Sequence, residues 1–153
     1  MANTFLDTFA NSANFTITLA SLASSTSGVG RQSTLIDNST TRATWARVFV
    51  KVKTTATTTA NSVVYVYLIR GDGTNRDDAA GASDAAFTAQ NASLIGTLTT
   101  GSTTTAQTIQ GMFDVYGIGK EWGIAVVNST GTALDSTAGN HAASYVAGYV
   151  SKV

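Results

Sequence analysis

The chain has 153 residues, nine basic and nine acidic side chains, and neither cysteine nor proline. A net charge of zero gives no general attraction to nucleic acid or to an anionic membrane, and the lack of cysteine excludes disulfides and thiolate metal sites. Twenty-six threonines and fifteen serines stand beside a single histidine, His141, and a single glutamate, Glu121. This composition favours a β-rich scaffold or binding protein over an enzyme, with no cofactor and no metal.

The N-terminal segment Met1–Asn14 has no clear period. Phe5, Leu6 and Phe9 could share one helical turn, or they could anchor an arm on a neighbouring molecule. We therefore predict an N-terminal arm over residues 1–14 and a single domain over residues 15–153. The segment lacks the cationic start and apolar stretch of a signal peptide, and no apolar run in the chain approaches the about 20 residues of a membrane span. We expect a protein made in the host cytoplasm, with no membrane partner.

Beyond residue 14 the pattern is typical of β-structure, because threonine and valine are enriched and Gly, Asn, Asp and Ser clusters separate short periodic runs. About eight strands are predicted, near Phe15–Leu22, Val29–Ile36, Thr44–Lys53, Val63–Arg70, Leu94–Thr99, Thr105–Val115, Trp122–Asn128 and Ala143–Val150. They suit an all-β fold, a two-sheet antiparallel β-sandwich with a jelly roll as the leading topology. An immunoglobulin-like sandwich and a barrel remain open alternatives.

The clearest pair of strands is Thr44–Lys53 and Val63–Arg70, joined by the polar run Thr54–Asn61. Alternate residues of both strands are uniformly apolar and should face the core. These are Ala46, Val48, Val50, Val52, Val64, Val66 and Leu68.

The opposite side of this pair carries aromatic and basic residues, and a face this apolar is not expected to lie bare in water. The N-terminal segment, the long loop after Arg70, another subunit or a ligand could cover it. We predict an interface with a partner or a second copy, made by Trp45, Arg47, Phe49, Lys51, Tyr65, Tyr67, Phe5 and Phe9.

The stretch Gly71–Ala92 is the only long irregular one, and Ser83–Gln90 could form a short capped helix within it. Its four aspartates do not follow the spacing of a calcium loop, and Arg76 lies among them. A solvated loop with turn-forming aspartates is the preferred interpretation. The four are Asp72, Asp77, Asp78 and Asp84.

Catalytic patterns are weak. His141 follows a turn and no Gly-x-Ser-x-Gly elbow accompanies it, whereas Glu121 could pair with Asp114 or Asp135 as in a glycosidase. The segments Gly28–Arg31 and Gly117–Lys120 lack the full spacing of a phosphate loop, so turns or bulges are the better interpretation.

Two ligand classes remain open for the aromatic face. Aromatic and basic residues on a sheet can stack nucleic-acid bases, although the neutral charge argues against nucleic acid. Rows of aromatic rings can also stack on sugars, which would make the chain a carbohydrate-binding or adhesin module.

Several segments together resemble small structural proteins of tailed bacteriophages. They are Gly28–Thr34, Ile36–Asn38, the alternating strand Val48–Val52 and the run Val64–Gly73. The similarity is greatest to capsid decoration, or cement, proteins with a jelly-roll-like sandwich. This resemblance implies a non-enzymatic virion protein on the capsid surface, commonly a homotrimer, that clamps subunits of the major capsid protein.

Overall fold

A computed structural model describes residues 5–101 and 105–152, with the backbone alone at 5–7 and 151–152. Its elements are almost all strands, with one 3₁₀ turn, η1 (Ala138–Asn140). The strands are β1 (Phe5–Phe9), β2 (Ala13–Asn14), β3 (Val29–Gln32), β4 (Ile36–Asp37), β5 (Trp45–Lys53), β6 (Val63–Gly71), β7 (Ala85–Thr88), β8 (Ser93–Thr99), β9 (Thr108–Tyr116), β10 (Glu121–Ser129) and β11 (Ala142–Lys152). Within the described residues, no helix is long and apolar enough to cross a membrane.

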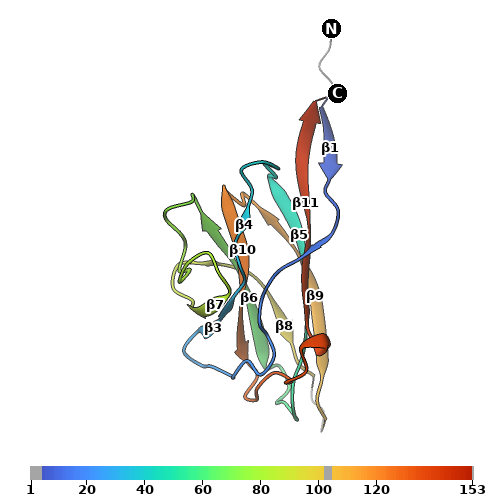
Figure 1. The fold of residues 1–153 in the computed structure, drawn as a ribbon. Helices are drawn as coiled ribbons and strands as arrows, with labels where there is room; N and C mark the ends of the chain where they lie inside the picture. The colour runs from blue at the N-terminus through green and yellow to red at the C-terminus, as the bar shows by residue number, and fades with distance from the viewer. Residues whose placement is uncertain (1–4, 102–104, 153) are drawn as a thin grey trace.

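The strands form two antiparallel sheets packed as a sandwich (Figure 1). Sheet A has the order β1-β11-β5-β9, with β2 also paired to β11. Sheet B has the order β7-β3-β10-β6-β8, with β4 also paired to β10. The predicted fold class, an all-β two-sheet jelly-roll sandwich, is confirmed. Two of the eleven strands are only two residues long, which accounts for most of the excess over the eight expected.

The core lies between the sheets and is built from the residues that the alternation selected. All seven predicted core positions of β5 and β6 are at most 1% exposed. Trp122 of β10 completes this core with Phe15, and their rings meet edge to face with centroids 5.5 Å apart, a spacing typical of aromatic pairs.

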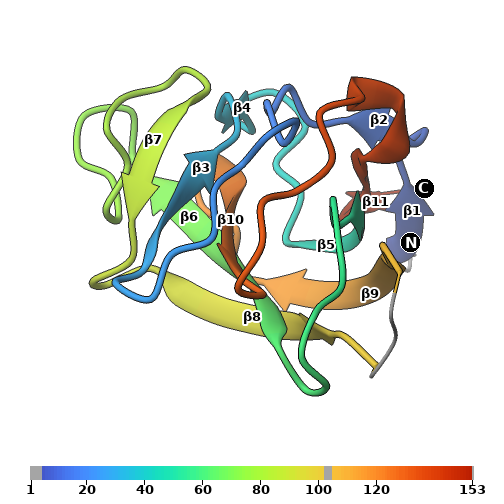
Figure 2. The same ribbon diagram turned by 90° about the horizontal axis from the view of Figure 1, so that it is seen from below.

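The expectation that β5 and β6 are neighbours is wrong. β5 pairs with β11 and β9 in sheet A, whereas β6 pairs with β10 and β8 in sheet B. The polar run after β5 carries the chain across the end of the sandwich from one sheet to the other, as Figure 2 shows. Two strands that each have an apolar face can bury both faces side by side in one sheet or opposite one another across the core, and β5 and β6 lie opposite one another.

Two further local predictions differ from the structure. Residues 15–22 alternate in burial as a strand would, but they cross over the core without joining a sheet ladder. Ser83–Gln90 contains a strand, β7, and no helix. β7 pairs with β3 and places Phe87 against the sheet at 2% exposure, so burial of this ring overrides the local helix signal.

The predicted N-terminal arm is largely part of sheet A. β1 pairs with the end of β11 over Phe5–Phe9, and β2 pairs further along the same strand. β1 and the end of β11 extend beyond the rest of the sandwich at the top of Figure 1. Residues 1–4 of the predicted arm, and the side chain of Phe5, lie outside the described part of the structure.

Candidate interaction surface

The residues predicted to form one aromatic face lie on opposite sides of the molecule. Trp45, Arg47 and Phe49 point outward from sheet A, whereas Tyr65 and Tyr67 point outward from sheet B. The separation follows from the positions of β5 and β6 in different sheets. The predicted single surface is therefore wrong, and the two outward faces have to be considered one at a time.

The outward surface of β3, β10 and β6 lies beneath residues 72–92, and we call it the covered face. A second apolar cluster forms here from Ile69, Phe87, Ala125 and Val127, with Tyr67 packed against it. The Tyr67 and Phe87 ring centroids are 5.9 Å apart. Burial raises the pKa of the Tyr67 hydroxyl. Figure 1 shows the loop that follows β6 folded back on the outer side of sheet B.

Buried and charged side chains hold this loop in place. Gln32 is fully buried, donates from Nε2 to the carbonyls of Gly81 and Ser83, and accepts the Ala80 N–H at Oε1. Asp84 pairs with the guanidinium of Arg31. A single glutamine thus ties the middle of the loop to sheet B.

Asp78 closes the far end of the loop. Its carboxylate accepts the backbone N–H groups of Gln90 and Ala92 at 2.6 and 2.7 Å and also that of Asn91. Partial burial opposes ionisation, but the N–H donors of Ala92, Gln90 and Asn91 outweigh it and hold the pKa of Asp78 below its ordinary value. Asp78 and Asp84 therefore stabilise the conformation of the loop through hydrogen bonds and an ion pair.

Within residues 5–101 and 105–152 no such cover lies over the outward surface of β11, β5 and β9, which has Phe9 at its edge, and we call this surface the open face. Its first row is Gly148, Trp45 and Tyr116, which are directly opposite one another on the three strands. A Cβ atom on Gly148 would lie 2.1 Å from the Trp45 ring, so the indole rests directly on this glycine. Phe9 meets the indole edge to face, with centroids 5.3 Å apart.

Apolar and polar rows alternate along the open face. Below Trp45 comes Arg47, whose guanidinium donates to both oxygens of Asp114 at 2.7 and 3.0 Å. Phe49 and Met112 form the next row, and Lys51 and Gln110 the one after it. The Arg47 hydrogen bonds lower the pKa of Asp114 and, in turn, raise that of Arg47. This central pair is therefore internally neutral.

Large apolar side chains on the open face are strongly exposed. Met112 and Tyr116 are 68% and 69% exposed, and Phe9 and Val150 are 63% and 54% exposed. Large exposed apolar side chains gathered on one face favour an interaction surface. No other described segment packs over these four side chains.

Sequence reasoning missed Met112, Tyr116 and Val150. The outward set of β9 mixes polar and apolar residues, Gln110, Met112, Asp114 and Tyr116, so the pattern did not mark it as an apolar surface. Pairing with β5 is what places Met112 beside Phe49 and Tyr116 beside Trp45.

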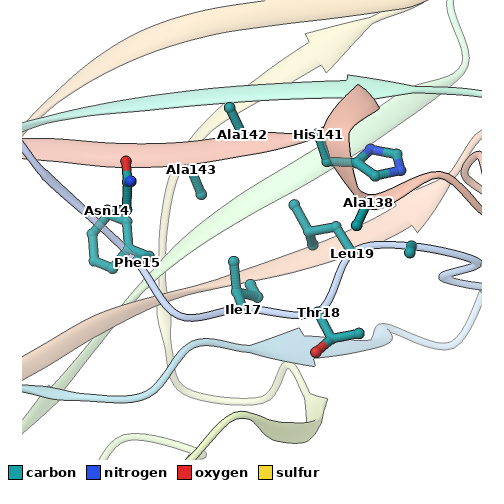
Figure 3. A pocket seen from close by; sticks show the side chains of 10 residues that line it. Asn14, Phe15, Ile17, Thr18, Leu19, Ala138, His141, Ala142 and Ala143 are labelled. Atoms are coloured by element: carbon teal, nitrogen blue, oxygen red, sulfur yellow. The ribbon is translucent and has the colours of Figure 1, made fainter.

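The side chain of His141 is held by contacts with the backbone. Its Nε2 lies 2.9 Å from the carbonyl oxygen of Asp135, and the Lys53 N–H donates to Nδ1 at 3.4 Å. The ring also lines a pocket of about 350 Å³ between residues 14–20 and the start of β11. Figure 3 shows Ile17 and Leu19 pointing across this pocket toward the side of Ala143 and His141. The described lining residues carry no charged side chain.

The carboxylates considered for catalysis or metal binding are engaged by different groups. Glu121 accepts two hydrogen bonds from Arg76, at 2.9 and 3.3 Å, whereas Asp114 is bound by Arg47. The Thr137 N–H and the Asn140 amide lower the pKa of Asp135 to about 2. Among the described residues, no group of three or more His, Cys, Asp or Glu side chains could hold a metal ion.

The chain matches no protein-family model and no curated protein. Among solved structures it is similar to murine APRIL at pH 8.0, with a TM-score of 0.46 and 7% identity over 95% of this chain and 99% of that one. It is also similar to Eiger TNF from S. frugiperda, with a TM-score of 0.41 and 9% identity over 95% and 92% of the two chains. A third is CBM35 from Cellvibrio japonicus Abf62, with a TM-score of 0.38 and 15% identity over 97% and 96%. At these TM-scores and identities, the similarity says nothing about a ligand or a partner of this chain.

Proposed function

We propose that this chain is a non-enzymatic virion structural protein of the capsid-decoration type. It binds the outer surface of a lattice of major capsid protein and stabilises the head, and it requires no cofactor. The resemblance of Gly28–Thr34 and Val64–Gly73 to phage structural proteins supports the virion part of this proposal. The observation that carries the binding part is the open face.

The open face suits a protein whose work is to hold other proteins. It is a row of rigid strands with exposed aromatic and thioether side chains, and these residue types are enriched at protein interfaces. Arg47 and Asp114 satisfy one another at 2.7 Å, so a partner can cover this pair without leaving either charge unpaired, and Lys51 is a further cation on the same face. The equivalent surface of sheet B is filled by the chain itself, through Phe87 and residues 72–92.

Co-sedimentation with assembled shells of the major capsid protein encoded by the same phage genome tests the proposal. We expect saturable binding and shells that resist heat or denaturant better when decorated. Met112→Asp should abolish binding, either directly or because copies no longer assemble, whereas Leu94→Asp should not. Leu94 is the matched control because it is 52% exposed at the edge of sheet B, opposite Tyr67. Absence of binding by the wild-type chain at saturating concentration would refute the proposal.

A second candidate function is carbohydrate binding, favoured by the arrangement of Trp45 and Tyr116. The indole lies on Gly148 with its outer side available, and Tyr116 stands beside it on the neighbouring strand. A glycan array separates the two functions. Selective sugar binding that Trp45→Ala removes and Tyr65→Ala retains would favour a carbohydrate-binding module of a tail or head fibre. Tyr65 is the control because it lies on sheet B.

A further inference from the structure

We infer that two copies of this chain pack open face to open face around a two-fold axis. The inference names the partner of the surface on which the proposed function rests. It assigns the open face to contact between copies, so that a pair of copies is the unit that binds the capsid. Three properties of the face lead to this assignment: its size, its charge balance and the order of its rows.

The face is large enough for a specific contact between two copies. β5 and β9 each run nine residues, which is about 30 Å at roughly 3.3 Å per residue. The β1–β2 edge, β11, β5 and β9 make four strand positions, which are about 19 Å wide at roughly 4.8 Å spacing. Two such faces together cover roughly 1,100 Å², just above the about 1,000 Å² that a specific interface needs.

The charge on the face allows it to meet a copy of itself. Arg47 and Asp114 cancel one another, and both oxygens of the carboxylate are occupied by the guanidinium. Lys51 has no ion-pair partner among the described residues. A self-contact is therefore favourable only if the two copies of Lys51 are kept apart, because like charges facing one another are destabilising.

The order of the rows selects one direction for the axis. An axis that runs across the strands reverses their direction in the second copy. It sets the Lys51–Gln110 row of one copy against the Trp45–Tyr116 row of the other. The ammonium group then faces aromatic rings, which attract cations. An axis along the strands would instead set each row against its own copy, and would place Lys51 against Lys51 where the axis passes over β5.

The same axis matches the central rows. The Arg47–Asp114 row faces the Phe49–Met112 row of the second copy, so that polar and apolar rows alternate across the contact. Such a contact is isologous, since each copy uses the same surface. It predicts a dimer, or an assembly of dimers, in place of the trimer that the phage resemblance implies.

Sedimentation velocity of the full chain tests the inference. We expect concentration-dependent association from 15.7 kDa to twice that mass, with a midpoint on the order of 10 µM because the contact is at the small end of specific interfaces. Met112→Asp should raise the dissociation constant at least tenfold. Leu94→Asp on sheet B should leave it unchanged. A strictly monomeric wild-type chain at about 500 µM, a trimer, or equal effects of the two variants would overturn the inference.

Cross-linking tests the direction of the axis. The chain has no native cysteine, so Gln110→Cys and Tyr116→Cys provide unique attachment points. A bis-maleimide that spans the about 10 Å between packed sheets should join Gln110→Cys to Tyr116→Cys in a mixture. It should join two copies of the same variant much less. Preferential cross-linking of identical variants would overturn the proposed axis.

Failure of this inference and failure of the proposed function are distinguishable. If Met112→Asp is monomeric and still decorates capsid shells, the self-contact stands and the role of the open face in capsid binding is overturned. If the wild-type chain is monomeric but Met112→Asp no longer binds shells, the open face contacts the capsid and the self-contact is overturned. If the wild-type chain dimerises as expected and never binds shells, the function is overturned and the self-contact stands.

Discussion

The outward faces of the two sheets both carry apolar residues, but one face is buried by the chain itself and the other is exposed. On sheet B, Tyr67, Ile69 and Val127 are packed under the chain's own loop. On sheet A, Met112 and Tyr116 remain more than two-thirds exposed. An apolar outward face is therefore not by itself the sign of an interface. The deciding feature is where the long connections run: the one after β6 folds back over sheet B, whereas the one after β2 packs Phe15 and Leu19 into the core.

The largest expected difference between the faces is in stability. Phe87→Ala removes a ring that is 2% exposed, and it should lower the free energy of unfolding by about 3–5 kcal/mol because a cavity opens beneath the loop. Met112→Ala on the open face should change it by less than about 0.5 kcal/mol. Urea denaturation followed by circular dichroism measures both. Equal losses would mean that the open face is covered in solution as well.

A smaller effect is expected where the open face approaches its own backbone. Gly148→Ala would place a Cβ atom 2.1 Å from the Trp45 ring, so the indole has to move off the sheet. We expect a loss of about 1–3 kcal/mol and a red shift of tryptophan emission. Ala147→Gly serves as the control for backbone flexibility, since Ala147 is its buried neighbour on the same strand. An unchanged emission spectrum would show that Trp45 does not rest on Gly148.

The covered face should contribute to the pH dependence of the free energy of unfolding through Asp78. The pKa of Asp78 is lowered in the folded state, so its contribution to stability is complete above the unfolded value of about 3.9 and is lost as the pH falls through the lower folded value. Asp78→Asn should cost about 1–2 kcal/mol at pH 6. It should also reduce the further loss between pH 5 and pH 2.5 relative to the wild-type chain. Denaturation curves at these pH values provide the measurement, and parallel curves would contradict the role of Asp78.

The smallest expected effect is at the centre of the open face. Arg47→Met removes an exposed ion pair with Asp114, which should leave the free energy of unfolding nearly unchanged because surface ion pairs contribute little to stability. If two copies meet here, the variant should weaken their association, because it leaves Asp114 without its partner in the contact. Sedimentation with Arg31→Met as the matched control on sheet B separates the effect on association from the effect on stability.

Much of the fold followed from sequence patterns, because alternation depends only on which side of a strand faces the core. The inward residues from Ala46 to Val52 and from Val64 to Leu68 are all buried as predicted. Sheet membership did not follow, since β5 and β6 have the same alternation in neighbouring strands as in strands that face one another. The same ambiguity explains residues 15–22, whose alternation reflects burial on one side without any ladder.

Part of the candidate surface was predicted correctly from the sequence. Trp45, Phe49 and Phe9 lie on the open face, whereas Tyr65 and Tyr67 belong to sheet B. Met112 and Tyr116 could be found only once β9 was paired with β5, because cross-strand neighbours come from a part of the chain more than 60 residues away. The helix expected near Ser83–Gln90 failed for a related reason: Phe87 gains more from packing against Tyr67 and Val127 than the segment gains from a local turn.

The amino-acid sequence by itself determined the class of the fold, the residues that face the core and the scarcity of side chains suited to catalysis. These properties depend on composition and on the period of two along a strand, and both are local. The tertiary structure alone decided which outward face is covered. That outcome depends on where the loop after β6 can reach and on which strands β9 and β11 pair with, and those are long-range contacts that no local pattern of residues records.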